Sequence, residues 1–177
     1  MDLILWRHAE AELSTNDLKR PLTAEGHQQA KCMSNWICHR FAGPYLVWTS
    51  EALRAQETAS YLEGRSRQVH AFLNPGASAR SILPEILKVS STNQLVIVGH
   101  QPWLSELVYL LLFPGTHSLR KTSEIDFKYG GICWLKIDVT SLTSVLKAFL
   151  PSRLLADYLC HQRSKSSAKI DDSTTAQ

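Results

Sequence analysis

The stretch Leu3-Ile4-Leu5-Trp6-Arg7-His8 (residues 3–8, LILWRH) decides how this chain is expected to fold. Four apolar residues in a row end abruptly at an arginine and a histidine, which is typical of a buried strand that runs into a loop. Two later stretches share this pattern: residues 45–49 (YLVWT) precede a serine, and residues 95–98 (LVIV) precede Gly99-His100. The sequence therefore predicts three buried strands, each followed by polar residues.

Segments with helical periodicity connect these strands. We expect one helix from Thr23 to about Arg40, with apolar residues spaced to form one face. A second helix is predicted to be capped by Ser50 and ended by Gly64. A third opens at Pro102, a residue type favoured at the first helical position.

The remaining segments give weaker signals. A strand is expected over residues 69–73, and a short helix over 79–89 that Pro84 should kink or begin. Two further strands are predicted near residues 131–139 and 144–150. Because strands alternate with helices, we expect a three-layer α/β/α fold with a mostly parallel central sheet.

The length of 177 residues fits one domain, which we place at residues 1–162. Residues 114–128 are expected to be irregular, and a short helix is expected near 154–161. Residues 163–177 are nearly devoid of apolar side chains and are predicted to be a polar C-terminal tail.

Composition narrows the class of protein. Hydrophobic residues make up 44% of the chain and charged residues 20%, and the net charge of +3 is not gathered into basic runs, so no nucleic-acid partner is expected. The longest apolar run, residues 107–113, is far shorter than the roughly 20 residues needed to cross a bilayer. Four cysteines without a CxxC pair are interpreted as free, largely buried thiols. We therefore expect a cytoplasmic protein without a membrane partner.

Reactive side chains follow the predicted strands. Arg7 and His8 end the first, Arg54 lies in the first turn of the helix after the second, and His100 follows the third. Ligands of open α/β sheets bind beyond the carboxyl ends of the strands, so these side chains are expected to converge. Arginine offers paired donors to phosphate, and neutral histidine can attack phosphorus. This chemistry requires no metal and no cofactor.

Four segments, in order and at suitable spacing between residue 2 and about residue 139, resemble the histidine phosphatase (phosphoglycerate mutase-like) superfamily. One of them is similar to a run found in its short SixA-type phosphohistidine phosphatases. The segments are LWRHAEAE (5–12), RPLT with Gly26 (20–26), SEALRAQETA (50–59) and VIVGHQP (96–102).

The resemblance implies a role for each matching residue. His8 would be the nucleophile that becomes phosphohistidine, and Arg7 and Arg54 would bind the phosphoryl oxygens. His100 would complete the pocket and stabilise the transition state. As further substrate contacts we name Arg20, at the lip of the pocket, and Gln101, beside His100.

The sequence departs from the family pattern at two positions. Ala9 stands where glycine is usual, which is tolerated if the backbone there has a negative φ. Phe72 stands where SixA relatives often have glutamate, so no general acid is identified. An ester's alkoxide leaves poorly without a proton, whereas a phosphohistidine can release neutral imidazole. We therefore expect a phosphorylated histidine as the substrate.

The expected partner is a phosphorylated protein, for example a histidine phosphotransfer domain. The alternative within the superfamily is a phosphatase of small phosphate esters such as sugar or nucleotide phosphates. A catalytically silent phospho-binding protein would be a different class, but the presence of both histidines and both arginines disfavours it.

Overall fold

The computed structural model describes residues 1–41, 43–62, 66–89, 93–115 and 125–153. The predicted helix near 154–161, the tail and the domain boundary lie outside these residues, as does Gly64. The described elements are β1 (Asp2–Arg7), a 3-10 turn (η1, Asp17–Lys19), α1 (Ala24–Arg40), β2 (Leu46–Thr49), α2 (Leu53–Ser60), β3 (Ser66–Val69), a second 3-10 turn (η2, Ala71–Leu73), α3 (Ala79–Leu87), β4 (Gln94–Gly99), α4 (Trp103–Leu112), β5 (Ile132–Asp138) and β6 (Thr143–Leu150).

The strands form one sheet in the order β3-β2-β4-β1-β5-β6. β3, β2, β4 and β1 run parallel to one another, with Leu5 opposite Ile97 in the β1–β4 register. β5 and β6 are antiparallel and close the other side. The predicted α/β fold is confirmed, and the sheet is mixed because the last two strands are joined by a hairpin turn.

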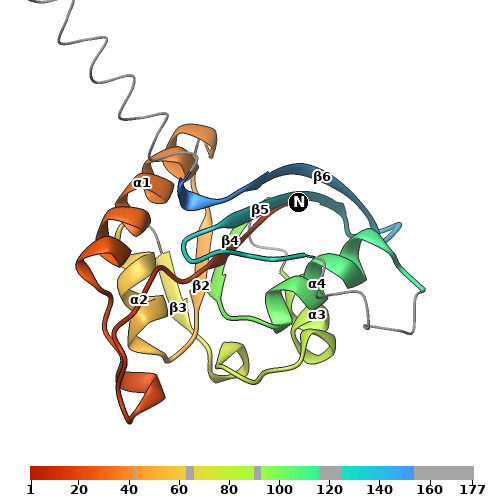
Figure 1. Ribbon diagram of the computed structural model, residues 1–177. Helices are drawn as coiled ribbons and strands as arrows, with labels where there is room; N and C mark the ends of the chain where they lie inside the picture. The colour runs from red at the N-terminus through yellow and green to blue at the C-terminus, as the bar shows by residue number, and fades with distance from the viewer. Residues whose placement is uncertain (42, 63–65, 90–92, 116–124, 154–177) are drawn as a thin grey trace, which may run out of the picture.

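Side-chain alternation along β1 divides the apolar core between the two faces of the sheet. Leu3 and Leu5 belong to a cluster that includes residues of α3 and α4. Ile4 and Trp6 point the other way, into a cluster with residues of α1 and α2. Successive side chains of a strand point to opposite faces, so a run of four apolar residues requires cover on both. Figure 1 shows the two helix pairs on either side of the sheet.

The predicted strand over residues 69–73 is wrong. The third strand in chain order covers Ser66–Val69, and residues 71–73 form a 3-10 turn that buries Leu73. The backbone N–H groups of Leu73 and Asn74 donate to His70 and Ala71, because closing this turn satisfies them after β3 has ended.

Ser50 does not cap α2, which begins at Leu53 with Ala52 in the cap position and no side-chain cap bond. Pro84 lies inside α3 and does not begin it. Of the three described cysteines, all free, only Cys133 is buried, so the prediction of largely buried thiols is also wrong.

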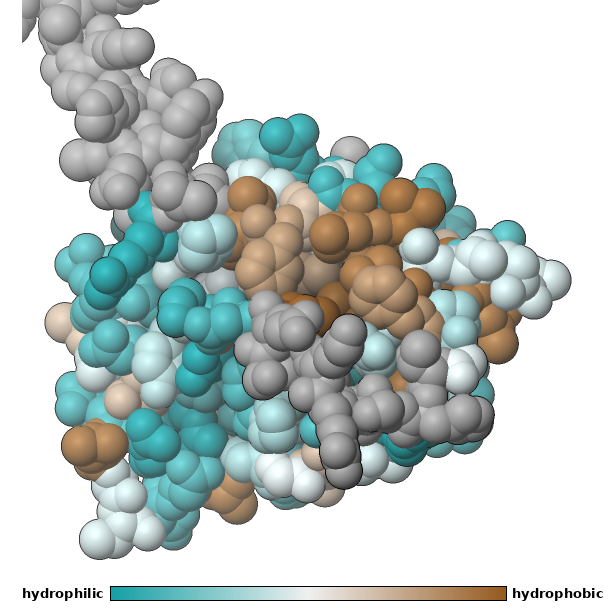
Figure 2. Space-filling view, turned by 45° about the vertical axis from the view of Figure 1, so that its right-hand side comes forward, coloured by the Kyte–Doolittle hydropathy of each residue, from teal (hydrophilic) through white to brown (hydrophobic). Residues whose placement is uncertain are grey.

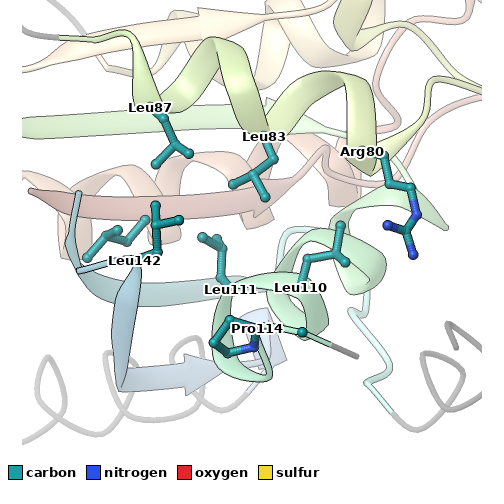
Figure 3. Close-up of a pocket in the computed structure, with 9 residues that line it drawn as sticks. Arg80, Leu83, Leu87, Leu110, Leu111, Pro114 and Leu142 are labelled. Atoms are coloured by element: carbon teal, nitrogen blue, oxygen red, sulfur yellow. The ribbon is translucent and has the colours of Figure 1, made fainter. Parts of the chain in front are cut away.

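Apolar side chains also reach the surface, and Figure 2 shows them gathered on one face of the molecule. A groove of about 290 Å³ lies between α3, α4 and the turn before β6 (Figure 3). None of the predicted site residues lines it. In the described part of the chain, no helix is both long and apolar enough to cross a membrane. The groove is lined mainly by Leu83, Leu87, Leu110, Leu111 and Leu142, with Arg80 at one end.

Candidate active site

The side chains that follow β1, β2 and β4 meet beyond the carboxyl ends of these strands. The backbone N–H of His8 donates to the carbonyl of Gly99 at 3.0 Å, so the β1–β4 pairing continues to the point where both strands end. This pairing places His8 beside His100, with ring centroids 5.0 Å apart. Both histidines are buried.

The orientation of the His8 ring assigns its proton. Nδ1 lies 2.7 Å from the carbonyl oxygen of Ala9, which can only accept, so Nδ1 carries the hydrogen. Nε2 therefore keeps its lone pair, and Arg54 Nε donates to it at 3.2 Å. Nε2 is the atom that can attack phosphorus.

Arg54 is held by a loop far away in sequence. Its Nη1 donates to the backbone oxygen of Asp17 at 2.5 Å, and its Nη2 pairs with the Asp17 carboxylate at 2.9 Å. Arg20 pairs with the other oxygen of the same carboxylate at 3.2 Å. Asp17 therefore links the predicted lip residue to the guanidinium beside His8.

Arg7 is bound by the segment that precedes β5. Its Nη1 donates to the backbone oxygen of Phe127 at 2.5 Å, and its guanidinium carbon lies 3.9 Å from the centre of the Tyr129 ring. The same ring lies 5.6 Å from that of His8. Arg7 Nε is buried, and no described residue accepts a hydrogen bond from it.

His100 is oriented by Ser50. Its Nε2 lies 2.7 Å from Ser50 Oγ, which also accepts from the backbone N–H of Ala52 at 3.2 Å. The Nδ1 atom is buried, and no described residue hydrogen-bonds to it. If the hydroxyl donates to Nε2, the ring proton lies on Nδ1, where it can be donated to a phosphoryl oxygen.

The loop that carries His8 is fixed at two further points. Thr58, the threonine of the 50–59 segment, accepts from the backbone N–H of Ala9 at 3.0 Å. Thr23 caps α1, and its N–H donates to the Glu10 carbonyl at 3.0 Å. A Cβ on Gly26 would lie 2.0 Å from that carbonyl oxygen, so only glycine permits this approach. Ala9 is not among the described residues with positive φ, which removes the objection to alanine there.

Burial determines the charge state of both histidines. Burial, and then the positive charges of Arg54, Arg7 and Arg20, lower the pKa of His8 to about 3 against the opposing effect of the Ala9 carbonyl. Burial and the neighbouring His8 lower the pKa of His100 to about 2. Both rings are therefore neutral at pH 7, so His8 Nε2 carries no proton.

These pKa values predict a loss of stability in mild acid. Both folded pKa values lie below the unfolded value of about 6.5, so below that pH only the unfolded chain takes up these protons. The free energy of unfolding should fall from pH 6.5 to 4 by up to about 1.4 kcal/mol per pH unit for each histidine. Denaturant titrations at several pH values measure this free energy of unfolding.

The variant His100→Gln should lose part of this pH dependence, because it removes one of the two groups. His27→Gln is the matched control, since His27 is exposed and its ring contacts only Tyr61 among the described rings. Equal slopes for the wild type and His100→Gln would contradict the neutral state assigned to His100.

The structure brings His8, Arg54 and His100 into direct or ring contact and places Arg7 beside them. Arg20 reaches this group only through Asp17. The amide of Gln101 is hydrogen-bonded to Ser105, 2.8 Å from its Oγ. The roles of Arg20 and Gln101 as substrate contacts remain predictions.

Sequence reasoning missed Asp17, Tyr129 and the contact of Ser50 with His100. Asp17 lies in a polar segment, and only its position three residues before Arg20 indicates an ion pair. Trp103, which follows the His100 segment, is fully buried and packs against Gly99.

Three described carboxylates near the site, those of Asp17, Glu10 and Glu51, each have a side-chain partner. Partial burial raises the pKa of Asp17, but hydrogen bonds and charges from Arg54 and Arg20 outweigh it and lower the pKa below its ordinary value. Glu10 accepts from the Thr23 hydroxyl, and Glu51 accepts from the Asn74 amide. Among the residues that the structure covers, no group of three or more His, Cys, Asp and Glu side chains could hold a metal ion.

A neutral imidazole nitrogen flanked by two guanidinium groups and a second imidazole, at the carboxyl ends of parallel strands, is an arrangement suited to binding and transferring a phosphoryl group. Residues 3–77 match the family model of the histidine phosphatase superfamily, branch 1. The chain belongs to this superfamily, and its relatives include SixA proteins.

The relatives agree with this assignment. The chain is 29% identical to the phosphohistidine phosphatase SixA homolog of Haemophilus influenzae over 61% of this chain and 75% of that protein. The structure of the histidine phosphatase SixA complexed with tungstate has a TM-score of 0.75 at 21% identity, covering 88% of this chain and 99% of that one. A putative alpha-ribazole-5'-P phosphatase from Escherichia coli has a TM-score of 0.69 at 19% identity, covering 86% and 97%.

Proposed function

We propose that the protein is a phosphohistidine phosphatase that transfers a phosphoryl group from a phosphorylated histidine of a protein partner to His8 and then to water. The observation that carries the proposal is the state of His8, whose Nδ1–H is bound by the Ala9 carbonyl while Nε2 keeps its lone pair. In this arrangement Nε2 can form and break a bond to phosphorus without gaining or losing a ring proton.

The reaction has two steps, transfer of the phosphoryl group to His8 and its hydrolysis, and bonds and protons balance in each. His8 Nε2 bonds to phosphorus as the bond from phosphorus to the substrate imidazole breaks. The substrate ring, protonated on its other nitrogen, leaves as neutral imidazole. Water then attacks the phosphoryl group on Nε2, and its proton goes to phosphate or solvent. His8 leaves neutral because Nδ1 kept its hydrogen throughout.

The net positive charge around His8 favours binding of a dianionic phosphoryl group. Arg7, Arg54 and Arg20 supply three positive charges, and among the described residues Asp17 is the one carboxylate ion-paired with them. The balance is two positive charges in a site where burial weakens screening by water. Guanidinium groups suit phosphoryl oxygens because each offers several N–H donors in one plane.

The engaged carboxylates favour a phosphorus–nitrogen substrate over an ester. Asp17 stays ionised because two arginines bind it, so it has no proton to give at neutral pH. An ester's alkoxide needs such a proton, and a positioned acid is worth about 10²–10⁴-fold in rate. Imidazole needs none, because it departs neutral.

The test compares a phosphohistidine peptide, a sugar phosphate and an aryl phosphate. We expect kcat/KM to be at least about 10²-fold higher for the phosphohistidine peptide than for the sugar phosphate. The aryl phosphate should lie between them, because phenolate leaves more readily than an alkoxide.

Faster turnover of the sugar phosphate would instead support a small-molecule phosphatase. Binding of phosphorylated peptides without any turnover, and without a labelled phosphoryl adduct on His8, would support a silent phospho-binding protein. Acid-labile, base-stable labelling of His8 separates these outcomes.

A further inference from the structure

The two arginines beside His8 are oriented by different kinds of group. Asp17 binds Arg54 with a carboxylate, which offsets the charge of that guanidinium. Arg7 is bound by the neutral Phe127 carbonyl and by the face of the Tyr129 ring. Within the described part of the chain, no carboxylate forms an ion pair with Arg7.

The Tyr129 ring is held in place by the segment that carries it. The N–H of Gly130 donates to the His8 carbonyl at 3.1 Å, and the indole N–H of Trp6 donates to the Gly130 carbonyl at 3.0 Å. On the other side, Ser152 Oγ donates to the Tyr129 carbonyl at 2.7 Å. Gly130 has a φ of +69°, which a non-glycine residue rarely adopts. The turn is therefore fastened directly to the backbone of His8.

We propose that Tyr129 is a positioning residue for Arg7, whose guanidinium it holds beside His8 so that the buried Nε can donate to a phosphoryl oxygen. The ring lies 3.9 Å from the guanidinium carbon and 5.6 Å from the His8 ring, so it joins the two groups. Arg7 Nε is buried and no described residue accepts from it, which leaves it for a ligand. The inference rests on the proposed phosphoryl site but not on the identity of the leaving group.

An aromatic ring can orient a guanidinium group without neutralising its positive charge, whereas a carboxylate offsets that charge. The negative face of the ring attracts the cation but carries no net charge. A second carboxylate, on Arg7, would reduce the balance of positive charge around His8 from two to one. Tyr129 thus orients Arg7 and keeps its full charge for a dianionic phosphoryl group. Burial lowers the pKa of Arg7, and this effect is opposed by the charges of Tyr129 and Asp126 and, as the smallest cause, by a hydrogen bond to the Tyr129 side chain.

The test uses two substitutions at one position. Tyr129→Phe keeps the ring and removes the hydroxyl, whereas Tyr129→Leu removes the ring and keeps an apolar side chain. We expect Tyr129→Leu to weaken binding of inorganic phosphate, measured by calorimetry, and to lower kcat/KM by about 10-fold, within the range for a partly buried cation–π contact. The loss should be similar for phosphohistidine peptide and aryl phosphate. Tyr129→Phe should change either quantity less than about 3-fold.

A double-mutant cycle separates positioning from a general effect on folding. In the Arg7→Met background, Tyr129→Leu should cost less than about 2-fold more, because the cation it positions is gone. Tyr109→Leu is the matched control, since that ring contacts Phe113 in the part of the chain that the structure covers. It should leave phosphate binding unchanged, and thermal unfolding checks that every variant is folded.

Three results would overturn the inference. These are a Tyr129→Leu variant equal to the wild type, a Tyr129→Phe variant as weak as Tyr129→Leu, and a full loss in the Arg7→Met background. Phosphate binding requires no turnover. The wild type could hydrolyse no phosphohistidine peptide and still bind phosphate. If Tyr129→Leu then weakened phosphate binding and Tyr129→Phe did not, the proposed function would be contradicted and this inference supported.

Discussion

Replacing His8 with alanine is expected to lower kcat/KM for the phosphohistidine peptide by at least about 10⁴-fold, because the atom that forms the bond to phosphorus is lost. Arg7, Arg54 and His100 would still bind the substrate, so its affinity should fall much less than its turnover. Steady-state kinetics measures the first quantity and calorimetric titration the second. The labelled adduct seen in a rapid-quench experiment with the wild type should be absent.

His8→Gln checks that the loss does not come from a cavity, because glutamine has a similar length and fills much of the same space. It should be as inactive as His8→Ala. His27→Ala is the matched control, since His27 lies on the exposed side of α1 and its Nδ1 contacts the Tyr61 hydroxyl. Its activity should equal that of the wild type. An alanine variant at His8 with a tenth of the wild-type rate would exclude His8 as the nucleophile.

Substitution of Arg54 should produce the second largest effect. Arg54→Met is expected to lower kcat/KM by about 10³-fold and Arg54→Lys by about 10²-fold, since lysine keeps the charge but cannot replace the planar set of donors. Arg54 is buried, donates to His8 Nε2 and is aligned by Asp17, so both its charge and its direction matter. The same kinetics on phosphohistidine peptide and aryl phosphate measures the loss.

Arg54→Met should also raise the pKa of His8, because the charge of Arg54 is one cause of its low value. The acid limb of the kcat/KM profile should therefore move to higher pH in both variants. The shift should be smaller for Arg54→Lys than for Arg54→Met, because lysine keeps the positive charge. Arg40→Met is the matched control, because Arg40 lies on the surface over the Trp36 ring. Equal activities of the Arg40 and Arg54 methionine variants would remove Arg54 from the site.

Asp17→Asn is a graded version of the same experiment. Asparagine keeps the backbone carbonyl that accepts from Arg54 Nη1, but it loses the ion pairs to Arg54 and Arg20. Its effect should lie well below that of Arg54→Met, because the guanidinium remains.

Most of the sheet and the helix α1 could be predicted because they depend on short-range patterns. The buried strand before His8 and the strand before His100 are unbroken apolar runs, and Thr23 begins α1 with the cap that its sequence suggests. The strand near residue 69 was misplaced because β3 has four exposed residues and carries almost no apolar signal. Loops at the ends of buried strands then indicated where His8, Arg54 and His100 would meet.

The sequence by itself determined the kind of chemistry, through a histidine and arginines placed at strand ends. Only the tertiary structure decided which groups orient them. Arg7 is bound by a carbonyl 120 residues away, Arg54 by a carboxylate 37 residues away, and His100 by a hydroxyl 50 residues away. Strand and helix signals come from residues a few positions apart, whereas these contacts exist only after the sheet has brought distant loops together. For that reason LILWRH predicts a buried strand and a reactive His8, but not Tyr129 or Asp17.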